Sequence, residues 1–233
     1  MTDKPIMLIT GARKGIGRYL VEYYLKKDFF VIGCSRSESE ITDSNYLHYC
    51  LDVSNEKKIK DMFRDIRNKL GKLDVLINNA GIASMNHALL TPLDSVQAMM
   101  TTNFTGTFLF CREAGKLMKK NNFGRIVNFT TVATKMRLEG EAIYVATKAA
   151  VQSLTEVLSR ELAPDGITVN AMGPTPIETD LIRSVPKDKI EKITDRLAIK
   201  RLGNFSDVSN VVNFYISKQS DYITGQTVFL GGI

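Results

Sequence analysis

The stretch "IMLITGARKGIG", residues 6–17, decides how the rest of the chain is interpreted. Its first five residues form an apolar run typical of a buried strand, and Gly11, Gly15 and Gly17 then open the next helix. Glycines here let the backbone turn tightly and approach a pyrophosphate, which binds the free N–H groups at the helix start. The spacing differs from G-x-G-x-x-G, and a simple turn is the alternative interpretation.

Short β-type runs alternate with longer helical patterns along the chain. This alternation predicts an α/β fold: a doubly wound parallel sheet of about seven strands, covered by helices on both faces in three layers. Ligands of such folds bind beyond the carboxyl ends of the strands, so we expect the functional residues there. The expected strands are 6–10, 29–35, 46–53, 73–81, 124–131, 167–173 and 227–232, and the expected helices are 15–27, 55–70, 93–120, 142–163 and 206–217, with broken helical pieces over 178–200.

The composition of the 233 residues is that of an ordinary globular protein, with 44% hydrophobic and 24% charged residues. No linker divides the chain, so we expect one domain over residues 1–233. The net charge of +6 comes from lysines spread over helices that also carry Asp and Glu, which favours a solvated surface over binding to nucleic acid or to a membrane. No signal peptide and no apolar run of ~18 residues is visible, and we expect a cytoplasmic protein.

Cysteine and histidine are too scarce for two kinds of chemistry. Cys34, Cys50 and Cys111 are odd in number and widely spaced, which indicates neither a disulfide framework nor a metal site and fits a reducing compartment. His48 and His87 are the only histidines, and neither is close to a cysteine or an acidic cluster. We therefore expect no bound metal and no Ser/His/Asp triad.

Five motifs coincide in order and spacing with those of a known family. "TGARKGIG", "NNAG" at 78–81, Asn103 in "TTNFTGTF", "YVATK" at 144–148 and "PTPIETD" at 174–180 resemble the single-domain branch of the short-chain dehydrogenase/reductase family. The resemblance extends from about residue 6 to the C-terminal "YITGQTVFLGGI". It implies a Rossmann-like fold and an oxidoreductase that transfers a hydride between a nicotinamide cofactor and a small carbonyl or alcohol.

Tyr144 and Lys148 lie four residues apart and so share one face of the predicted helix. A phenol must have its pKa lowered from about 10 to near 7, ~4 kcal/mol, to act as an acid and base at neutral pH. An ammonium ~4.5 Å away contributes ~3–4 kcal/mol at an effective dielectric constant of ~20. The resemblance implies that Tyr144 exchanges a proton with the substrate oxygen, while Lys148 lowers its pKa and holds the ribose hydroxyls. A tyrosine at the core edge beside a snorkelling lysine is the alternative.

Two further residues complete the catalytic set that the resemblance implies. Thr131 stands where the family places a serine that hydrogen-bonds the substrate carbonyl; the hydroxyl is kept, with an added methyl group and a stiffer side chain. Thr130 and Thr134 are weaker candidates for that hydroxyl. Asn103 is expected to fix a water that relays protons toward Lys148. The alternative is an asparagine whose side chain bonds only to nearby backbone.

The residues after the second strand indicate which cofactor is used. Ser35 stands where an acidic residue would accept the ribose 2′-OH of NAD, and Arg36 follows, with Lys14 and Arg13 on the same side. Such a cluster suits a 2′-phosphate, so NADPH is preferred over NADH. A solvated basic loop is the alternative. The full cofactor-binding set implied by the resemblance is Thr10, Gly11, Arg13, Lys14, Gly15, Ile16, Gly17, Ser35, Arg36, Asp52, Val53, Asn79, Ala80, Gly81, Tyr144, Lys148, Pro174, Ile177 and Thr179.

The substrate is less readable than the cofactor. Residues 178–203 are expected to form a lid, and Thr175 stands where the family has a glycine. Family members that act on acyl carrier protein carry basic docking residues where this chain has Asn122 and Asp165, which weakens a carrier-bound substrate. The expected substrate-pocket residues are Ser84, Met85, His87, Lys135, Met136 and Arg137.

The resemblance leaves three possible functions open and implies a homo-oligomer. Reduction of a ketone to a secondary alcohol by NADPH is the leading interpretation. An alcohol dehydrogenase running in the opposite direction, or a catalytically idle cofactor-binding subunit, are the alternatives. A homodimer or homotetramer is expected through the helices 93–120 and 142–163.

Overall fold

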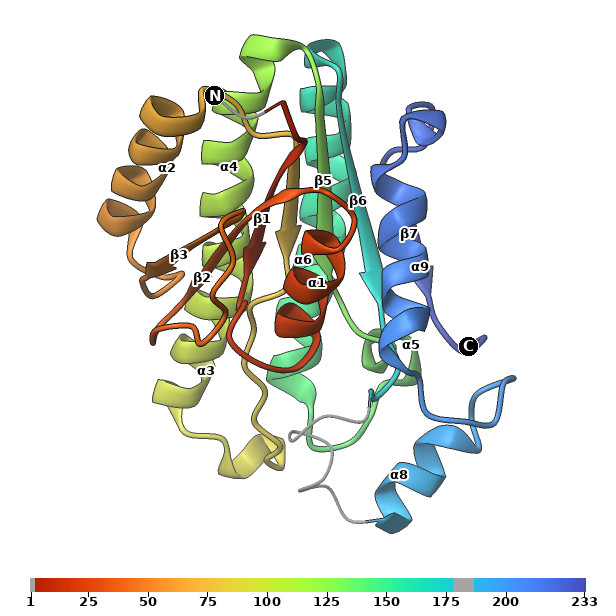
Figure 1. Ribbon diagram of the computed structural model, residues 1–233. Coiled ribbons are helices and arrows are strands. Elements are labelled where there is room, and N and C mark those ends of the chain that lie inside the picture. The colour runs from red at the N-terminus through yellow and green to blue at the C-terminus, as the bar shows by residue number, and fades with distance from the viewer. Residues whose placement is uncertain (1–2, 178–186) are drawn as a thin grey trace.

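A computed structural model describes residues 3–177 and 187–233, and its centre is one seven-stranded sheet (Figure 1). All neighbouring strands run parallel, in the order β3-β2-β1-β4-β5-β6-β7. The predicted α/β fold with a doubly wound parallel sheet of seven strands is confirmed. The strands are β1 (Ile6–Thr10), β2 (Phe30–Ser35), β3 (Tyr46–Cys50), β4 (Val75–Asn78), β5 (Gly124–Phe129), β6 (Ile167–Gly173) and β7 (Thr227–Phe229).

Two hydrophobic cores lie on opposite faces of the sheet because side chains alternate along each strand. Ile6 and Leu8 of β1 face one core, which is covered by α2 (Glu56–Leu70), α4 (Gly106–Met118) and α6 (Ala142–Leu162). Met7 and Ile9 face the other, which is covered by α1 (Gly15–Leu25) and α9 (Phe205–Ile216). The result is the predicted three-layer arrangement.

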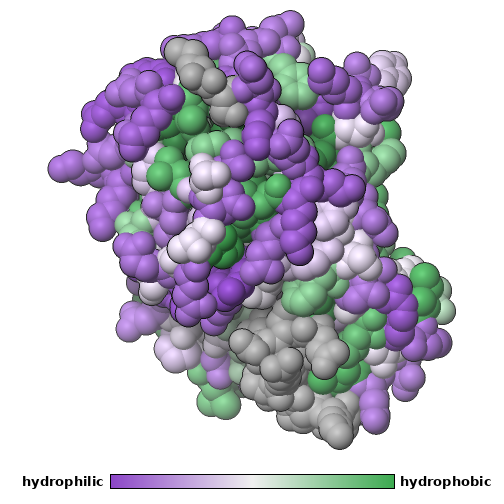
Figure 2. All heavy atoms as spheres, viewed as in Figure 1, coloured by the Kyte–Doolittle hydropathy of each residue, from purple (hydrophilic) through white to green (hydrophobic). Residues whose placement is uncertain are grey.

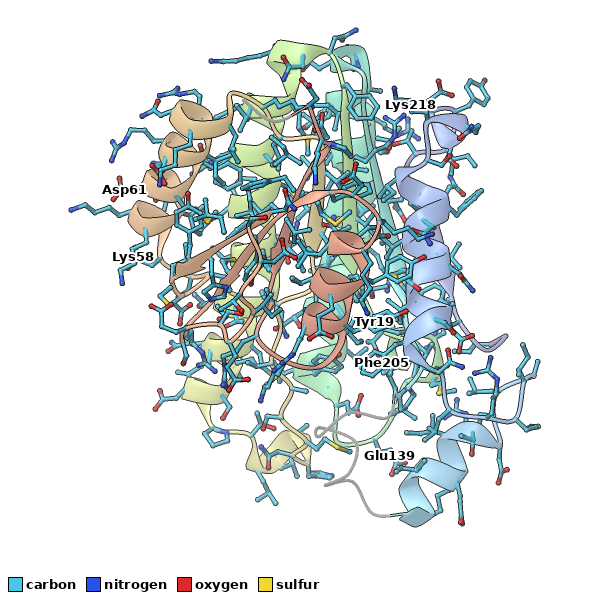
Figure 3. The ribbon with its side chains drawn as sticks, viewed as in Figure 1. Tyr19, Lys58, Asp61, Glu139, Phe205 and Lys218 are labelled. Atoms are coloured by element: carbon cyan, nitrogen blue, oxygen red, sulfur yellow. The ribbon has the colours of Figure 1, made fainter. Side chains whose placement is uncertain are left out.

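The face made by α1 and α9 is joined by aromatic rings and hydrogen bonds. Figure 3 labels Tyr19 of α1 and Phe205 of α9, whose rings stack with centroids 4.9 Å apart. Tyr24 of α1 is buried, and its hydroxyl donates to Asn213 Oδ1 of α9 at 2.9 Å. These contacts fix α1, and hence the glycine-rich turn before it, against the sheet.

The region predicted as one helix over 93–120 is helical throughout, but its hydrogen-bonding pattern changes along its length. It consists of α3 (Leu93–Met99), a π-helical segment (Met100–Thr105), α4 and a 3₁₀ turn (Lys119–Asn121). The predicted helix is therefore confirmed in extent. Its π-helical segment contains Asn103, which bonds to the backbone of Ile82, a contact between segments that helical periodicity does not reveal.

Several strands end earlier than predicted, and their polar residues lie in the turns that follow. The predicted strand 73–81 ends at Asn78, and the predicted strand 46–53 ends at Cys50. Asp52 then caps a turn, since its Oδ1 accepts from the backbone N–H of Ser54 at 2.8 Å. These turns all follow the carboxyl ends of the strands. Shorter helices in the same region are α5 (Ala133–Met136) and α8 (Lys187–Thr194), and the first nine residues of the predicted lid, 178–186, lie outside the described residues.

Hydrophilic side chains spread over most of the face shown in Figure 2 and do not gather in one patch. Many of the surface cations are paired, as in Arg112 with Glu56 and Lys119 with Asp165. Within residues 3–177 and 187–233, no helix combines the length and apolar character that crossing a membrane requires.

Candidate active site

The glycine-rich turn after β1 is fixed by contacts that only glycine permits. Gly11 has a φ of 68°, in the left-handed region that favours glycine, and its N–H donates to the carbonyl of Cys34 at 2.9 Å. A Cβ at Gly17 would lie 2.2 Å from the carbonyl oxygen of Gly11. The first turn of α1 therefore packs directly on the loop, which brings the N–H groups of the helix start to the carboxyl edge of the sheet.

The "NNAG" turn after β4 holds this loop from the other side. The Asn79 side chain donates from Nδ2 to the carbonyl of Thr10 at 3.0 Å, and the N–H of Ala80 donates to Thr10 Oγ1 at 2.9 Å. The Asn79 amide and the Thr10 hydroxyl are thus both hydrogen-bonded within the protein. Thr10 and Asn79, predicted to bind cofactor, act in the structure as the tie between the β1 and β4 turns, at the point where the strand order reverses.

A cavity of about 690 Å³ lies at this edge and joins the glycine loop to the start of α6. Fifteen of the predicted cofactor-binding residues line it: Gly11, Arg13, Lys14, Gly15, Ile16, Ser35, Arg36, Asp52, Val53, Asn79, Ala80, Gly81, Tyr144, Lys148 and Pro174. Five predicted residues lie outside the lining set: Thr10, Gly17, Asn103, Thr131 and Ile177. Thr179 lies outside the described residues.

Burial dominates the electrostatics of Tyr144 and Lys148. Desolvation raises the pKa of Tyr144 to about 12, although a hydrogen bond with Thr131 acts in the opposite direction. Desolvation also lowers the pKa of Lys148 to about 8, and its Nζ donates to the carbonyl of Phe129 at 2.8 Å. That Lys148 lowers the pKa of Tyr144 in the protein with its cofactor bound stays a prediction.

Thr131 lies directly after β5 and reaches the phenol of Tyr144, the contact that lowers the tyrosine pKa. Its Oγ1 also accepts from the N–H of Ala133 at 3.2 Å, which fixes the side chain at the start of α5. The hydroxyl predicted to replace the family's serine is therefore beside the tyrosine. Thr130 is turned away, because its Oγ1 donates to the carbonyl of Lys148 at 3.1 Å.

Asn103 is fully buried, and its side chain is occupied by protein partners. Its Oδ1 accepts from the N–H of Ile82 at 2.8 Å, and its Nδ2 donates to the carbonyl of Ile82 and to Thr147 Oγ1. A Cβ at Gly81 would lie 3.3 Å from both Asn103 Oδ1 and Lys148 Nζ. Asn103 therefore lies next to the lysine, and its side chain bonds to two segments far away in the sequence, at Ile82 and Thr147.

The cations at the far end of the cavity are unneutralised. Arg13, Lys14 and Arg36 line it, and none of the three forms an ion pair with a described carboxylate. Arg36 nevertheless lies close enough to Asp52 that its charge helps to lower the pKa of that carboxyl. By contrast, Arg18 on the next turn of α1 is paired with Glu22 and Glu40 at 2.9 and 3.1 Å. Positive charge facing the cavity is thus available to an anion.

The sequence matches the profile of the short chain dehydrogenase family over residues 5–190. The chain belongs to this family. Two curated relatives are the 3-oxoacyl-(acyl-carrier-protein) reductases FabG of Salmonella typhimurium and of Escherichia coli strain K12. Each is 33% identical to this chain, over 97% of this chain and 96% of the relative. The chain is therefore an NAD(P)-dependent oxidoreductase of the short-chain dehydrogenase family.

Solved structures of family members superpose on the whole chain. The structure of ElxO with NADP bound has a TM-score of 0.90 and 30% identity over 97% of both chains. YwfH, an NADPH-dependent reductase involved in bacilysin biosynthesis, has a TM-score of 0.87 and 26% identity over 99% of this chain and 98% of that chain. The aldohexose dehydrogenase of Thermoplasma acidophilum has a TM-score of 0.91 and 27% identity, over 98% of this chain and 93% of that one.

Sequence reasoning missed part of the cavity wall of this short-chain dehydrogenase. Each of the missed residues lies one or two positions before or after a predicted site residue, so extending each motif by two residues in both directions would have found them. Residues predicted for the substrate pocket, Ser84, Met85, His87, Lys135, Met136 and Arg137, lie outside the lining set, and Met136 is buried against Val132 and Leu197 instead. The missed lining residues are Ser37, Leu51, Ile82, Ala83, Thr102, Phe129 and Thr130.

Proposed function

We propose that this protein reduces a ketone to a secondary alcohol with NADPH. One observation carries the proposal: a single cavity is lined at one end by Tyr144 and Lys148 and at the other by Arg13, Lys14 and Arg36, cations that form no ion pair with a described carboxylate. A dinucleotide phosphate has its reactive ring and its 2′-phosphate at opposite ends, so a cavity with these two ends suits it.

The residues present fit a bound dinucleotide. The glycine-rich turn and the first N–H groups of α1 would hold the pyrophosphate, because Gly11 and Gly15 line the cavity and carry no side chain. Asp52 and the Val53 backbone would meet the adenine, and Lys148 the ribose hydroxyls beside the nicotinamide. When bound, NADPH supplies the hydride that reduces the carbonyl carbon.

Tyr144 would supply the proton that the reduction requires. With a pKa raised to about 12, its phenol is protonated at neutral pH, which is the form needed to donate to a carbonyl oxygen as negative charge develops on it. The Thr131 hydroxyl, beside the phenol, would orient that oxygen. Oxidation of an alcohol would need the phenolate instead.

The choice of NADPH rests on the turn after β2. Ser35 and Arg36 line the cavity where an acidic residue would repel a 2′-phosphate, and Arg36 has no ion-pair partner among the described residues. Two relatives of solved structure support this choice, since ElxO was solved with NADP bound and YwfH is an NADPH-dependent reductase.

The substrate would be a small carbonyl compound such as a 3-oxoacyl group or a keto sugar. Relatives named 3-oxoacyl-(acyl-carrier-protein) reductases support the first and a relative named aldohexose dehydrogenase supports the second. Asn122 and Asp165 argue against docking of an acidic carrier protein, because Asp165 carries negative charge and is paired with Lys119 at 3.1 Å.

The whole chain would act as one domain, because β7 near the C-terminus pairs with β6 in the same sheet as the glycine-rich turn. It would form a homodimer or homotetramer. α4 and α6 leave Phe108 and Val157 37% and 50% exposed, and these helices are the expected interface. The cysteine thiols are free, which suits the reducing cytoplasm.

The cofactor proposal is tested by Arg36→Asp, measured as kcat/KM for NADPH and for NADH with a ketone found in a carbonyl screen. The carboxylate repels a 2′-phosphate and can accept from a 2′-OH, so the NADPH to NADH ratio should fall by at least about tenfold. An unchanged ratio would overturn the proposed preference. Tight NADPH binding without turnover of any carbonyl compound would instead favour the idle-subunit alternative.

A further inference from the structure

A partly buried histidine connects β3 to the turn that carries Arg36. His48 Nδ1 lies 2.8 Å from the hydroxyl of Tyr46, and His48 Nε2 lies 3.0 Å from the carbonyl of Ser37 and 3.1 Å from Ser35 Oγ. Ser35 Oγ itself donates to the Ser37 carbonyl at 2.7 Å. One imidazole therefore contacts both residues that flank Arg36 in the sequence.

The hydrogen bonds agree with a single arrangement of protons. The one proton of the Ser35 hydroxyl is used on the Ser37 carbonyl, so His48 Nε2 must be the donor in its own contacts with these residues. His48 Nδ1 is then free to accept from the Tyr46 hydroxyl. A neutral imidazole protonated at Nε2 satisfies every partner, and the ring acts as a rigid spacer between the strand and the turn.

The surrounding residues make room for this spacer and support it. Gly33 of β2 pairs with His48 across the strands, and a Cβ at Gly33 would lie 2.2 Å from the Tyr46 hydroxyl oxygen. A hydrogen bond from Ser39 to Tyr46 ties the same turn a second time, and it acts to lower the tyrosine pKa, which burial raises. The turn 35–39 is thus attached to β3 at both of its ends.

We propose that His48 is a positioning residue for recognition of the cofactor's 2′-phosphate. Ser35, Arg36 and Ser37 line the cavity, whereas His48 stands behind them outside the lining set. Arg36 is exposed and has no carboxylate partner among the described residues to fix its direction, so its backbone must be held by its neighbours. His48 does this through Ser35 and Ser37, and thereby aims Arg36 at a phosphate. This inference rests on the proposed use of NADPH.

The test measures cofactor fragments, so that no substrate is needed. Adenosine 2′,5′-bisphosphate and adenosine 5′-monophosphate differ only in the 2′-phosphate. The Kd of the monophosphate divided by the Kd of the bisphosphate, both measured by calorimetry, therefore reports how strongly the protein recognises that phosphate. His48→Phe keeps a ring of similar width and removes the hydrogen bonds with Tyr46, Ser35 and Ser37. We expect it to reduce the ratio by about tenfold while the Kd for the monophosphate stays unchanged, and we expect Tyr46→Phe to reduce it less.

A double-mutant cycle with Arg36→Ala separates positioning from general loss of structure. If His48 acts through Arg36, His48→Phe should have no further effect on the ratio in the Arg36→Ala background. Tyr49→Phe is the matched control, because Tyr49 lies on the same strand and its hydroxyl donates to Asp65 of α2, away from the turn. It should leave the ratio unchanged.

Each outcome bears on one of the two claims. If Arg36→Ala lowers the ratio but His48→Phe does not, or lowers it equally in both backgrounds, the inference about His48 is overturned and the use of NADPH stands. If the unmodified protein shows no preference for the bisphosphate, the use of NADPH fails and the inference fails with it. Partial retention of the ratio in His48→Gln, which keeps a donor and an acceptor, would support positioning.

Discussion

Lys148 is a buried cation at the floor of the cavity, and its charge destabilises the protein that holds it. The side chain is 4% exposed, and burial lowers its pKa from 10.5 to about 8. Below pH 8 the folded protein carries the full cost of this charge, of order 3 kcal/mol. Between about pH 8 and pH 10.4 the unfolded chain binds more protons than the folded one, so the stability rises with pH in this window.

Lys148→Met should therefore stabilise the protein while abolishing its activity. We expect its free energy of unfolding to exceed that of the unmodified protein at about pH 7, and the difference to shrink at about pH 9.5. Urea denaturation of both proteins at the two pH values measures this. Comparing the two proteins cancels the other buried groups, such as the thiols of Cys34 and Cys111, whose pKa burial raises to about 12. A difference independent of pH would show that Lys148 is neutral, or paired, in the folded state.

Thr131 lies beside Tyr144, the proposed proton donor, and stands where the resemblance predicts a serine. If its hydroxyl polarises the substrate carbonyl, Thr131→Ala and Thr131→Val should both lower kcat/KM by 10²–10³, or about 2.7–4 kcal/mol. Thr131→Ser keeps the hydroxyl and should retain activity, with a small loss of stability from the missing methyl group. Steady-state kinetics with NADPH separates the three. Activity near the unmodified level in the Val and Ala variants would assign Thr131 to packing alone.

At the scale of elements, the end of β5 and the start of α5 are held to α6 by Gln152. Its Nε2 donates to Thr130 Oγ1 at 2.7 Å and to Thr134 Oγ1 at 2.9 Å, on either side of Thr131. One amide, a turn beyond Lys148 on the same helix, thus sets where the Thr131 hydroxyl lies relative to Tyr144.

Gln152→Leu removes both bonds and should loosen this turn. We expect the free energy of unfolding to fall by about 1–2 kcal/mol and kcat/KM to fall by about tenfold, with the Kd for NADPH unchanged. Urea denaturation, kinetics and calorimetry measure the three quantities. Gln97→Leu makes the same change at an exposed position on α3 and should alter none of them. Equal behaviour of the two variants would contradict a positioning role for Gln152.

The sequence could predict those helices, strands and turns that are determined by residues close together in the chain. The seven strands and the glycine turn follow from apolar runs and from glycines at fixed spacing, which nearby residues determine. The π-helical segment and the contacts of Asn79 depend on pairs of segments far apart in the chain, such as Asn103 with Ile82. The role of His48 depends on the register of β2 against β3, which no periodicity in one strand reveals.

The candidate site divides in the same way. The positions of Tyr144, Lys148 and the cations could be predicted because motifs fix them to strand ends and to one helix. The pKa of Tyr144 could not be predicted in full, because the largest contribution here is desolvation, which depends on residues far away in the sequence that pack around the phenol.

At the scale of the whole molecule, the exposed apolar residues of α4 and α6 predict self-association. Size-exclusion chromatography with light scattering should show a dimer or a tetramer. Val157→Glu, on α6, places a charge in the expected interface and should shift the protein toward a monomer. Leu89→Glu, at a position 88% exposed outside these helices, is the control and should not. A monomer in the unmodified protein would contradict the expected interface.

The central claim is that Tyr144 donates the proton while NADPH reduces a ketone, and one comparison tests it most directly. NADPH oxidation is followed across acyl thioesters, keto sugars, quinones and small ketones with the unmodified protein and with Tyr144→Phe, alongside calorimetry of NADPH binding. We predict that at least one ketone is reduced, that the Phe variant loses about 10³-fold or more in kcat/KM, and that its Kd for NADPH is unchanged, since the ring keeps its packing. Activity of Tyr144→Phe within about tenfold of the unmodified protein would contradict the claim.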